Sequence, residues 1–307
     1  MALLACCGRA ALAQDLTPRA YVITPLGSNA VIVTYSNLEG NVQFAGAVPI
    51  TDAHSTVNLA VASYYRSFDF FGRSANVALS VPYGFGDFRG NVKEVPAEDR
   101  RSGSLDAIVR LSVNLIGGPA MMPAEFIKWH QEVLLGASLT VVAPSGQYDP
   151  TRLINWGSNR WSFKPELGYS QRFGNWVVDG YFGGWFFTDN TEFFSHNQYS
   201  PGSNTRGEQP VGELEAHLSY DVQPRLWLSL DANYWWGGQT SLNGVTEPIS
   251  EQRSSRVGMS ASIPLTRTQA VKLSYSDGAF VRYGGNYKTI SIAWQYGWID
   301  RSKLPGH

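Results

Sequence analysis

The feature that most constrains this chain is a repeated alternation of apolar and polar residues at a period of two. Residues 226–236 show it most clearly, because the even positions are apolar while Ser229, Asp231 and Asn233 lie between them. Successive side chains of a β-strand point to opposite faces, so such a segment has one apolar and one polar face. A tilted strand of about ten residues crosses the hydrocarbon core of a membrane. The pattern therefore predicts an all-β protein, an antiparallel transmembrane β-barrel.

About twelve strands, an even number, are predicted from the alternating segments and the Gly, Pro, Asn, Asp and Ser clusters between them. They lie near residues 28–38, 54–68, 74–88, 103–117, 131–144, 159–172, 175–188, 210–222, 225–237, 252–264, 269–277 and 286–298. Short turns are expected at 70–73, 173–174, 223–224 and 265–268, and long connections at 39–53, 89–102, 145–158, 189–209, 238–251 and 278–285. Bacterial barrels have short periplasmic turns and long outer loops, so the barrel starts and ends on the periplasmic side. The connection at 118–130 is long although it lies among the short turns, and it is either a brief amphipathic helix or a loop.

Composition separates this barrel from a soluble β-sandwich. Only 16% of the residues are charged and 13% are aromatic, whereas soluble domains have about 25% charged residues. Aromatic residues gather at predicted strand ends, as at 64–65, 185–187, 234–236 and 294–298, where a membrane interface is expected. The formal net charge of −1 gives no basic face for a nucleic acid.

Both ends of the chain carry segments outside the predicted barrel of residues 28–298. Residues 1–13 are apolar and end in Ala11-Leu12-Ala13, which predicts a cleaved signal peptide and export through the periplasm to the outer membrane of a Gram-negative bacterium. Lipidation at Cys6 and a different start codon are alternatives. Residues 14–27 either form a short plug in the lumen or a periplasmic tail, and residues 299–307 form a C-terminal tail.

If apolar positions face lipid, the polar positions between them face the lumen. Their charged members and the most central aromatic residues are the candidate permeant-contacting residues. These are Arg66, Asp106, Arg110, Glu132, Lys164, Glu166, Asp179, Glu213, Glu215, His217, Asp231, Arg256, Lys272, Tyr181 and Trp227. The acids and bases are nearly equal in number, so they either form an ion-pair lattice that fills a narrow barrel or line a pore. Likewise, Trp185 and Trp235, together with Tyr181 and Trp227, either form a path for apolar solutes or simply fill space.

Signals for catalysis are weak. His196 follows Ser195 directly, an adjacency that cannot form a catalytic pair, and no metal-ligand spacing is present. The glycine-rich stretch 84–90 ends a strand and opens no helix, so it is not a phosphate-binding loop. We expect no enzyme activity, no cofactor and no bound metal.

Three segments in the first third of the chain resemble a known family. They are residues 17–36, with Thr24-Pro25-Leu26-Gly27-Ser28-Asn29, then Pro49-Ile50-Thr51-Asp52-Ala53, and residues 62–75, with Ala62-Ser63-Tyr64-Tyr65-Arg66. They are similar to the bacterial outer-membrane proteins labelled "putative meta-pathway of phenol degradation". The resemblance implies an uptake channel for small, in particular aromatic, compounds, and it supplies no catalytic residues. Outer-membrane barrels usually end on an aromatic residue, whereas here nine further residues follow Trp298.

Taken together, the sequence and the resemblance favour an outer-membrane channel for passive uptake of small molecules. The first alternative is a structural or surface-interaction barrel with a closed lumen, and a lipid-modifying enzyme is a distant third. Expected partners are the small-molecule permeant, outer-membrane lipid and the outer-membrane assembly machinery. No nucleic acid is expected.

Overall fold

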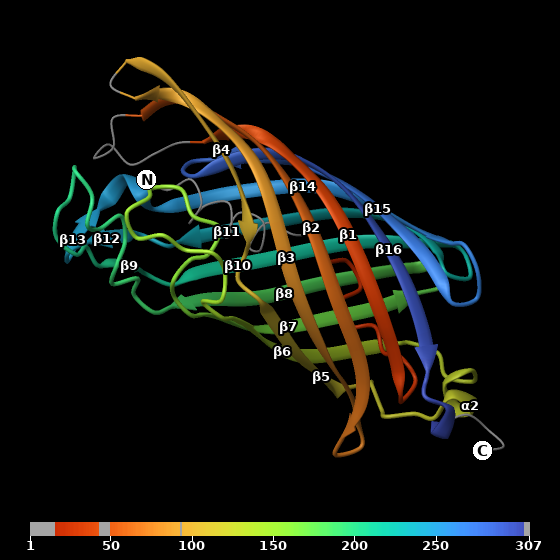
Figure 1. Cartoon of the computed structure of the whole chain (residues 1–307). Helices are drawn as coiled ribbons and strands as arrows, with labels where there is room; N and C mark the ends of the chain where they lie inside the picture. The colour runs from red at the N-terminus through yellow and green to blue at the C-terminus, as the bar shows by residue number, and fades with distance from the viewer. Residues whose placement is uncertain (1–15, 43–49, 93, 304–307) are drawn as a thin grey trace.

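A single sheet that closes on itself dominates the computed structural model, which describes residues 16–42, 50–92 and 94–303 (Figure 1). The sheet has thirteen strand segments in the order β2-β1-β16-β15-β14-β11-β10-β8-β7-β6-β5-β3-β4, and a β2–β3 pairing closes it. Because β4 and β5 pair with successive parts of β3, they are two halves of one interrupted strand. The result is an antiparallel barrel of twelve strands, which confirms the predicted fold class. The signal-peptide prediction for residues 1–13 lies outside the described residues.

The bounds of the barrel strands place most of them close to the predicted segments. They are β1 (Ser28–Val42), β2 (Ile50–Phe70), β3 (Arg73–Val92), β4 (Val95–Ser104), β5 (Ile108–Ile116), β6 (Val133–Val142), β7 (Ser162–Phe173), β8 (Trp176–Phe187), β10 (Val211–Gln223), β11 (Leu226–Gly237), β14 (Gln252–Pro264), β15 (Gln269–Val281) and β16 (Gly285–Ile299). We call the end of the barrel with the long connections the outer end and the opposite end the periplasmic end.

Several strands are longer than predicted, which corrects the expected loops at 39–53, 89–102 and 278–285. β2 and β3 have 21 and 20 residues and pair from Phe70–Arg73 to Ile50–Val92. With β4 they form a sheet that projects beyond the rest of the outer rim (Figure 1). Backbone hydrogen bonds to a neighbouring strand hold such an extension together whatever the side-chain pattern, so alternation underestimates its length.

Short elements cover the two ends of the barrel. At the outer end, β9 (Arg206–Glu208), β12 (Thr240–Leu242) and β13 (Val245–Glu247) form a separate three-stranded sheet, followed by η1 (Pro248–Ser250). At the periplasmic end, the 118–130 connection contains the four-residue α2 (Pro123–Phe126), so the helix alternative holds for part of it. The chain leaves β16 into η2 (Arg301–Lys303). Among the described residues, no helix is both long and apolar enough to cross a membrane.

The outward face of the barrel is apolar. Large aliphatic side chains such as Leu228, Leu230 and Ile290 are 51%, 63% and 62% exposed, which suits contact with lipid rather than water. The inward face is polar over much of its length, and side chains such as Glu213, Asp231 and Arg256 are almost completely buried there. Any functional site of this barrel therefore has to be built from its inward face and its outer mouth.

Candidate functional site

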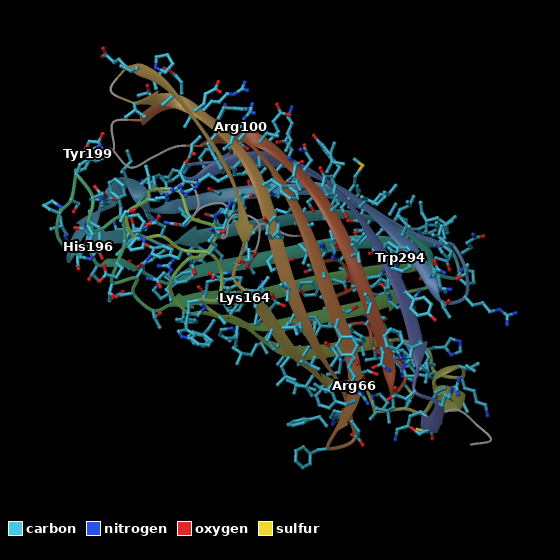
Figure 2. The ribbon with its side chains drawn as sticks, viewed as in Figure 1. Arg66, Arg100, Lys164, His196, Tyr199 and Trp294 are labelled. Carbon is cyan, nitrogen blue, oxygen red and sulfur yellow. The ribbon has the colours of Figure 1, made fainter. Side chains whose placement is uncertain are left out.

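One wall of the lumen, formed by β7, β8, β10 and β11, carries a network of buried charges. Along β10 the buried positions are Glu213, Glu215, His217 and Ser219, while the residues between them are exposed outward. This alternation is the one that the sequence predicts. Lys164 on β7, whose position Figure 2 marks, is buried on the same wall and contacts Glu213 of this network.

Lys164 holds three carboxylates together. Its Nζ lies 2.7 Å from Oε2 of Glu166, 3.1 Å from Oε2 of Glu213 and 3.4 Å from Oε1 of Glu215. Arg110 adds a second positive charge, with its Nη2 3.6 Å from Oε1 of Glu166. Charges taken out of water must be paired and hydrogen-bonded, and removing one partner leaves the other uncompensated. The arrangement is therefore a structural lattice on this wall.

His217 extends the lattice to β11. Its Nδ1 lies 2.9 Å from Oδ1 of Asp231, and its Nε2 lies 3.3 Å from Oε2 of Glu215. Asp231 also accepts hydrogen bonds from the hydroxyl groups of Ser229 and Ser260, the latter at 2.9 Å. With a carboxylate beside each ring nitrogen, an imidazolium would donate on both sides.

Arg19, Ala20 and Tyr21 lie inside the barrel against this charged wall, Leu16 borders the lumen cavity, and residues 24–27 contact β2 and the periplasmic rim. The backbone N–H of Arg19 donates to Oδ2 of Asp179 at 3.2 Å, and that of Ala20 donates to the hydroxyl of Tyr181 at 3.0 Å. The Arg19 guanidinium lies 2.7 Å from Asp221 and 4.8 Å above the ring of Trp227. Asp179, Tyr181 and Trp227 thus contact the chain's own N-terminal segment.

Tyr21 is the anchor of this segment and is 1% exposed. Its hydroxyl donates to Oε1 of Glu166 at 2.9 Å, and the Arg110 guanidinium lies 5.0 Å from its ring centre. The ring covers Gly136 and Gly168, which face each other across β6 and β7, and a Cβ on either glycine would overlap it. These glycines form a socket that sequence reasoning missed. The available signal was a pair of glycines on the inward positions of adjacent strands.

The opposite wall, formed by β14–β16 and β1–β3, differs in chemistry. Its inward side chains are mainly small hydroxyl residues and short aliphatic residues, and they border a lumen cavity of about 400 Å³. Arg256 is buried there and donates to the hydroxyl groups of Ser276 at 2.9 Å and Thr289 at 3.2 Å. Lys272 also lines this cavity. Asp231 on β11 reaches the same cavity, so three of the predicted candidates border open space.

Three predicted lumen residues lie elsewhere, which corrects their placement. Arg66 lies on the outer face near the periplasmic rim, where its Nη2 is 2.8 Å from Oδ2 of Asp300 (Figure 2). Asp106 accepts hydrogen bonds from the backbone N–H groups of Gly146 and Ser158, both at 2.9 Å, and so anchors an outer connection. Glu132 precedes β6 and is exposed.

The lumen tryptophans are held by polar partners. Trp185 donates through Nε1 to Glu213 at 3.1 Å, and Trp235 donates to Gln252 at 2.9 Å. Both rings are at most 5% exposed and pack with Val142 and Val211. This packing supports the space-filling interpretation of Trp185 and Trp235.

Comparison with known proteins agrees with the fold. A family model described as "Putative MetA-pathway of phenol degradation" matches residues 36–286. The chain is similar to an outer-membrane channel from Pseudomonas putida F1, with a TM-score of 0.77 at 18% identity over 92% of this chain and 100% of that one. The transport unit of the autotransporter AIDA-I from Escherichia coli has a TM-score of 0.52 at 10% identity, over 95% of this chain and 98% of that one. No curated protein matched in a sequence search.

A second autotransporter, the β domain of Bordetella BrkA, has a TM-score of 0.51 at 12% identity over 89% of this chain and 100% of that one. At such identities a structural likeness establishes the fold and leaves the transported solute open. A closed antiparallel barrel with an apolar outward belt has the form of a protein of the bacterial outer membrane, and these relatives agree with that location.

Proposed function

Since the chain belongs to the family described as "Putative MetA-pathway of phenol degradation", we propose that it is an outer-membrane channel through which small molecules pass passively, with aromatic compounds as the permeant class. The observation that carries this proposal is the lumen cavity of about 400 Å³ along the hydroxyl-lined wall. A space of this size suits a small ligand. Its lining offers hydroxyl groups beside short aliphatic side chains, which suits solutes with polar and apolar parts.

The N-terminal segment is the second element of the proposal. Arg19, Ala20 and Tyr21 lie against the charged wall and Leu16 borders the lumen cavity, so we propose that residues 16–27 act as a plug that narrows the passage. Arg110, Lys164, Glu166, Glu213, Glu215, His217 and Asp231 then hold the plug and the wall together. Permeant contact falls to Arg256, Lys272 and the hydroxyl groups around them, and to Asp231, which also borders the cavity.

A closed structural barrel is the competing function, and the same plug favours it. Two measurements on the full chain in lipid separate the alternatives: single-channel conductance and solute-driven swelling of proteoliposomes. We expect a low conductance and swelling by small solutes, both increased when Tyr21 is replaced by Ala. Absence of conductance and swelling in the wild type and in Tyr21→Ala would overturn the channel proposal in favour of the closed barrel.

Catalysis and cofactor binding have no part in this proposal. In the outer connection, Nε2 of His196 lies 2.9 Å from Oε2 of Glu192 and 3.3 Å from Oγ of Ser203. A catalytic relay needs the nucleophile and the acid on different ring nitrogens, so this group is not arranged for it. Within the described ranges, no three His, Cys, Asp or Glu side chains are placed to share a metal ion.

Two further partners follow from the barrel itself. The outward aliphatic side chains are proposed to contact outer-membrane lipid, and β16 is proposed to present the chain's C-terminal strand to the assembly machinery. Trp294, Tyr296 and Trp298 line the outward face of β16 with 37–40% exposure, as expected of aromatic residues at a membrane interface.

A further inference from the structure

A second pocket lies at the outer end, on the inward face of the projecting sheet. It has a volume of about 380 Å³ and lies between β2–β4 and the connection 145–158, which we call the strap. Phe88, Leu153 and Ile154 provide much of its apolar surface. A cavity of about 150 Å³ already holds a benzene ring, so this pocket has room for a substituted single ring.

Charged groups border the same pocket. Its lining includes Arg89, Arg101, Arg152, Glu98 and Asp99. Arg89 is paired with Glu98 at 3.4 Å, and Arg152 is paired with Asp149 at 3.0 Å. Arg101 is mostly buried and donates through Nη1 to the backbone carbonyl of Ile154. Its Nε is 3.9 Å from Asp99, which is a loose contact for an ion pair. Of the three cations Arg101 has the longest contact to a carboxylate, so an anionic or acceptor oxygen can meet it next to the apolar side chains.

Trp156 on the strap packs on Phe88 beside the pocket, with ring centres 6.3 Å apart, and is not one of the lining residues. The residue is 3% exposed, and its Nε1 is buried without a hydrogen-bond partner among the described residues. The indole ring lies over Gly84 and Gly103, where any Cβ would come closer to it than 3.0 Å.

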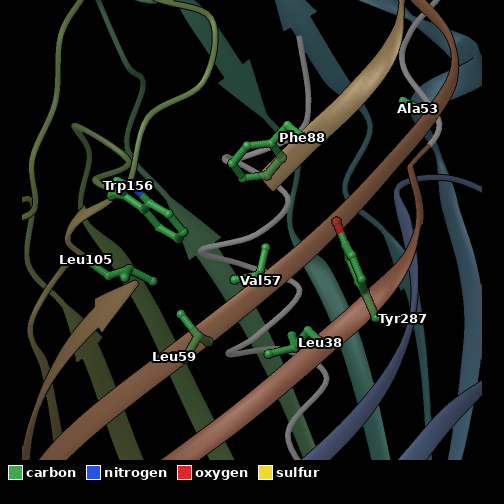
Figure 3. Packing of buried hydrophobic residues seen from close by; sticks show 8 residues of the cluster. All are labelled: Leu38, Ala53, Val57, Leu59, Phe88, Leu105, Trp156 and Tyr287. Atoms are coloured by element: carbon green, nitrogen blue, oxygen red, sulfur yellow. The ribbon is translucent and has the colours of Figure 1, made fainter. Parts of the chain in front are cut away.

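Between this pocket and the lumen cavity lies a cluster of buried apolar residues, which we call the seal (Figure 3). Its members are Leu38, Ala53, Val57, Leu59, Phe88, Leu105, Trp156 and Tyr287. Ala53 and Phe88 also line the outer pocket, whereas Leu38, Leu59 and Leu105 also line the lumen cavity. The seal is thus the wall that the two cavities share.

The order of residues along β2 shows how the seal runs from the outer pocket to the lumen cavity. Ala53, Ser55, Val57, Leu59 and Val61 occupy successive inward positions from the outer end towards the lumen, over a length of roughly 25 Å at about 3.3 Å per residue. Ser55 is the one polar residue among them, and its hydroxyl donates to that of Tyr287 at 3.1 Å. Apolar constrictions exclude ions and water. A solute with an apolar ring crosses such a step more easily than a hydrated ion does.

From this geometry we propose that the outer pocket binds a single-ring aromatic solute with an acceptor or anionic oxygen, and that the seal is the apolar step between this binding site and the lumen cavity. The ring packs on Phe88 and Ile154, and the oxygen accepts from Arg101. This inference rests on the proposed channel function and adds the first site that the permeant occupies.

Binding is tested on the full chain in detergent, with benzoate and phenol as probes and calorimetry as the readout. Ala97→Trp fills the pocket, and Arg100→Trp is its control, because Arg100 is 76% exposed and lies next to Asp87 on the outer surface (Figure 2). We expect at least tenfold weaker binding of both probes to Ala97→Trp and unchanged binding to Arg100→Trp. Arg101→Gln is expected to weaken benzoate binding more than phenol binding.

Swelling of proteoliposomes by small uncharged solutes is recorded for the same proteins, and heat-modifiable mobility on gels verifies that each variant is folded. Leu59→Ser, which hydrates the seal, is expected to raise ion conductance severalfold. The pocket assignment is overturned if Ala97→Trp and Arg100→Trp bind the probes equally well, or if the wild type does not bind them. Either result leaves the proposed channel function standing. Absence of swelling by every solute overturns the proposed function, and the binding result still decides whether the pocket is a site.

Discussion

The two walls of the lumen differ in the polar side chains that they carry and in how these side chains are paired. On the β7–β11 wall, long charged side chains meet in a lattice around Lys164 and His217, and residues 16–27 complete it. On the opposite wall, formed by β14–β16 and β1–β3, short hydroxyl side chains form hydrogen bonds with their neighbours. Ser36 pairs with Ser291 and Ser63 with Ser80, both at 2.7 Å. The first wall fills the barrel and the second leaves space. The comparison suggests that stability and passage are assigned to different sides of one narrow barrel.

The largest expected effect is on stability at the charged wall. Replacing Lys164 by Met leaves three buried carboxylates without their shared cation, which we expect to destabilise the barrel by about 3–5 kcal/mol. Lys272→Met on the hydroxyl wall is the matched control, because Lys272 is only partly buried there and lines the cavity. Urea unfolding in detergent measures both. Equal losses in the two variants would contradict the difference between the walls.

The next effect concerns the socket of the plug. Gly168→Leu places a side chain where the Tyr21 ring lies, so the N-terminal segment is expected to leave the charged wall and conductance to rise severalfold. Gly180→Leu is the control, since no atom lies within 4 Å of a Cβ added there. Single-channel recording gives the comparison. A conductance of Gly168→Leu no higher than that of Gly180→Leu would show that residues 16–27 do not limit the passage.

A smaller effect is expected from narrowing the hydroxyl wall. Ser274→Phe introduces a ring into the lumen cavity, whereas Leu273→Phe introduces the same ring on the lipid-facing side, where Leu273 is 44% exposed. Swelling of proteoliposomes is expected to slow severalfold for Ser274→Phe and to be unchanged for Leu273→Phe. If Ser274→Phe swells at the wild-type rate, the cavity is not the passage.

The smallest effect is a pH response outside both walls, in the strap. The pKa of Asp149 lies below its usual range because Thr151 donates hydrogen bonds to its carboxylate, with Arg152 adding a favourable charge. Because the pKa of Asp149 is lower in the folded protein than in the unfolded chain, its carboxylate stabilises the strap fully at pH values above the ordinary Asp pKa. This stabilisation is lost as the pH falls through the lower pKa of the folded protein. Hydrogen exchange of the strap should therefore stay slow until pH falls below the ordinary carboxyl range. Asp149→Asn should remove this pH dependence, and because Asp149 is largely exposed, the change is small.

The sequence predicted most of the strands and the inward residues of the charged wall. Period-two alternation predicted twelve strands and placed Lys164, Glu166, Glu213, Glu215, His217 and Asp231 on the inward face, where the structure has them. The rule behind this success is that apolar positions face lipid. It holds wherever the inward face is polar.

The same rule gave the wrong side for Arg66. On β2 the inward positions Val57, Leu59 and Val61 are apolar because they contribute to the seal and the cavity wall. With apolar residues on both faces, alternation no longer distinguishes lumen from lipid. Asp106 and Glu132 fall at strand breaks, where period two ends. The socket of Gly136 and Gly168 depends on strand register, which becomes visible only once the strands are paired.

The central claim, that the passage runs along the hydroxyl wall, is tested most directly by cysteine accessibility. In a chain with Cys6→Ser and Cys7→Ser, Ser274→Cys places one thiol on the cavity lining, and Ser219→Cys places one on the charged wall, where Ser219 is completely buried. A small charged thiol reagent is added to proteoliposomes, and both labelling and conductance are followed. We predict rapid labelling of Ser274→Cys with a fall in conductance, and little of either for Ser219→Cys. Faster labelling and stronger block at position 219 would contradict the account.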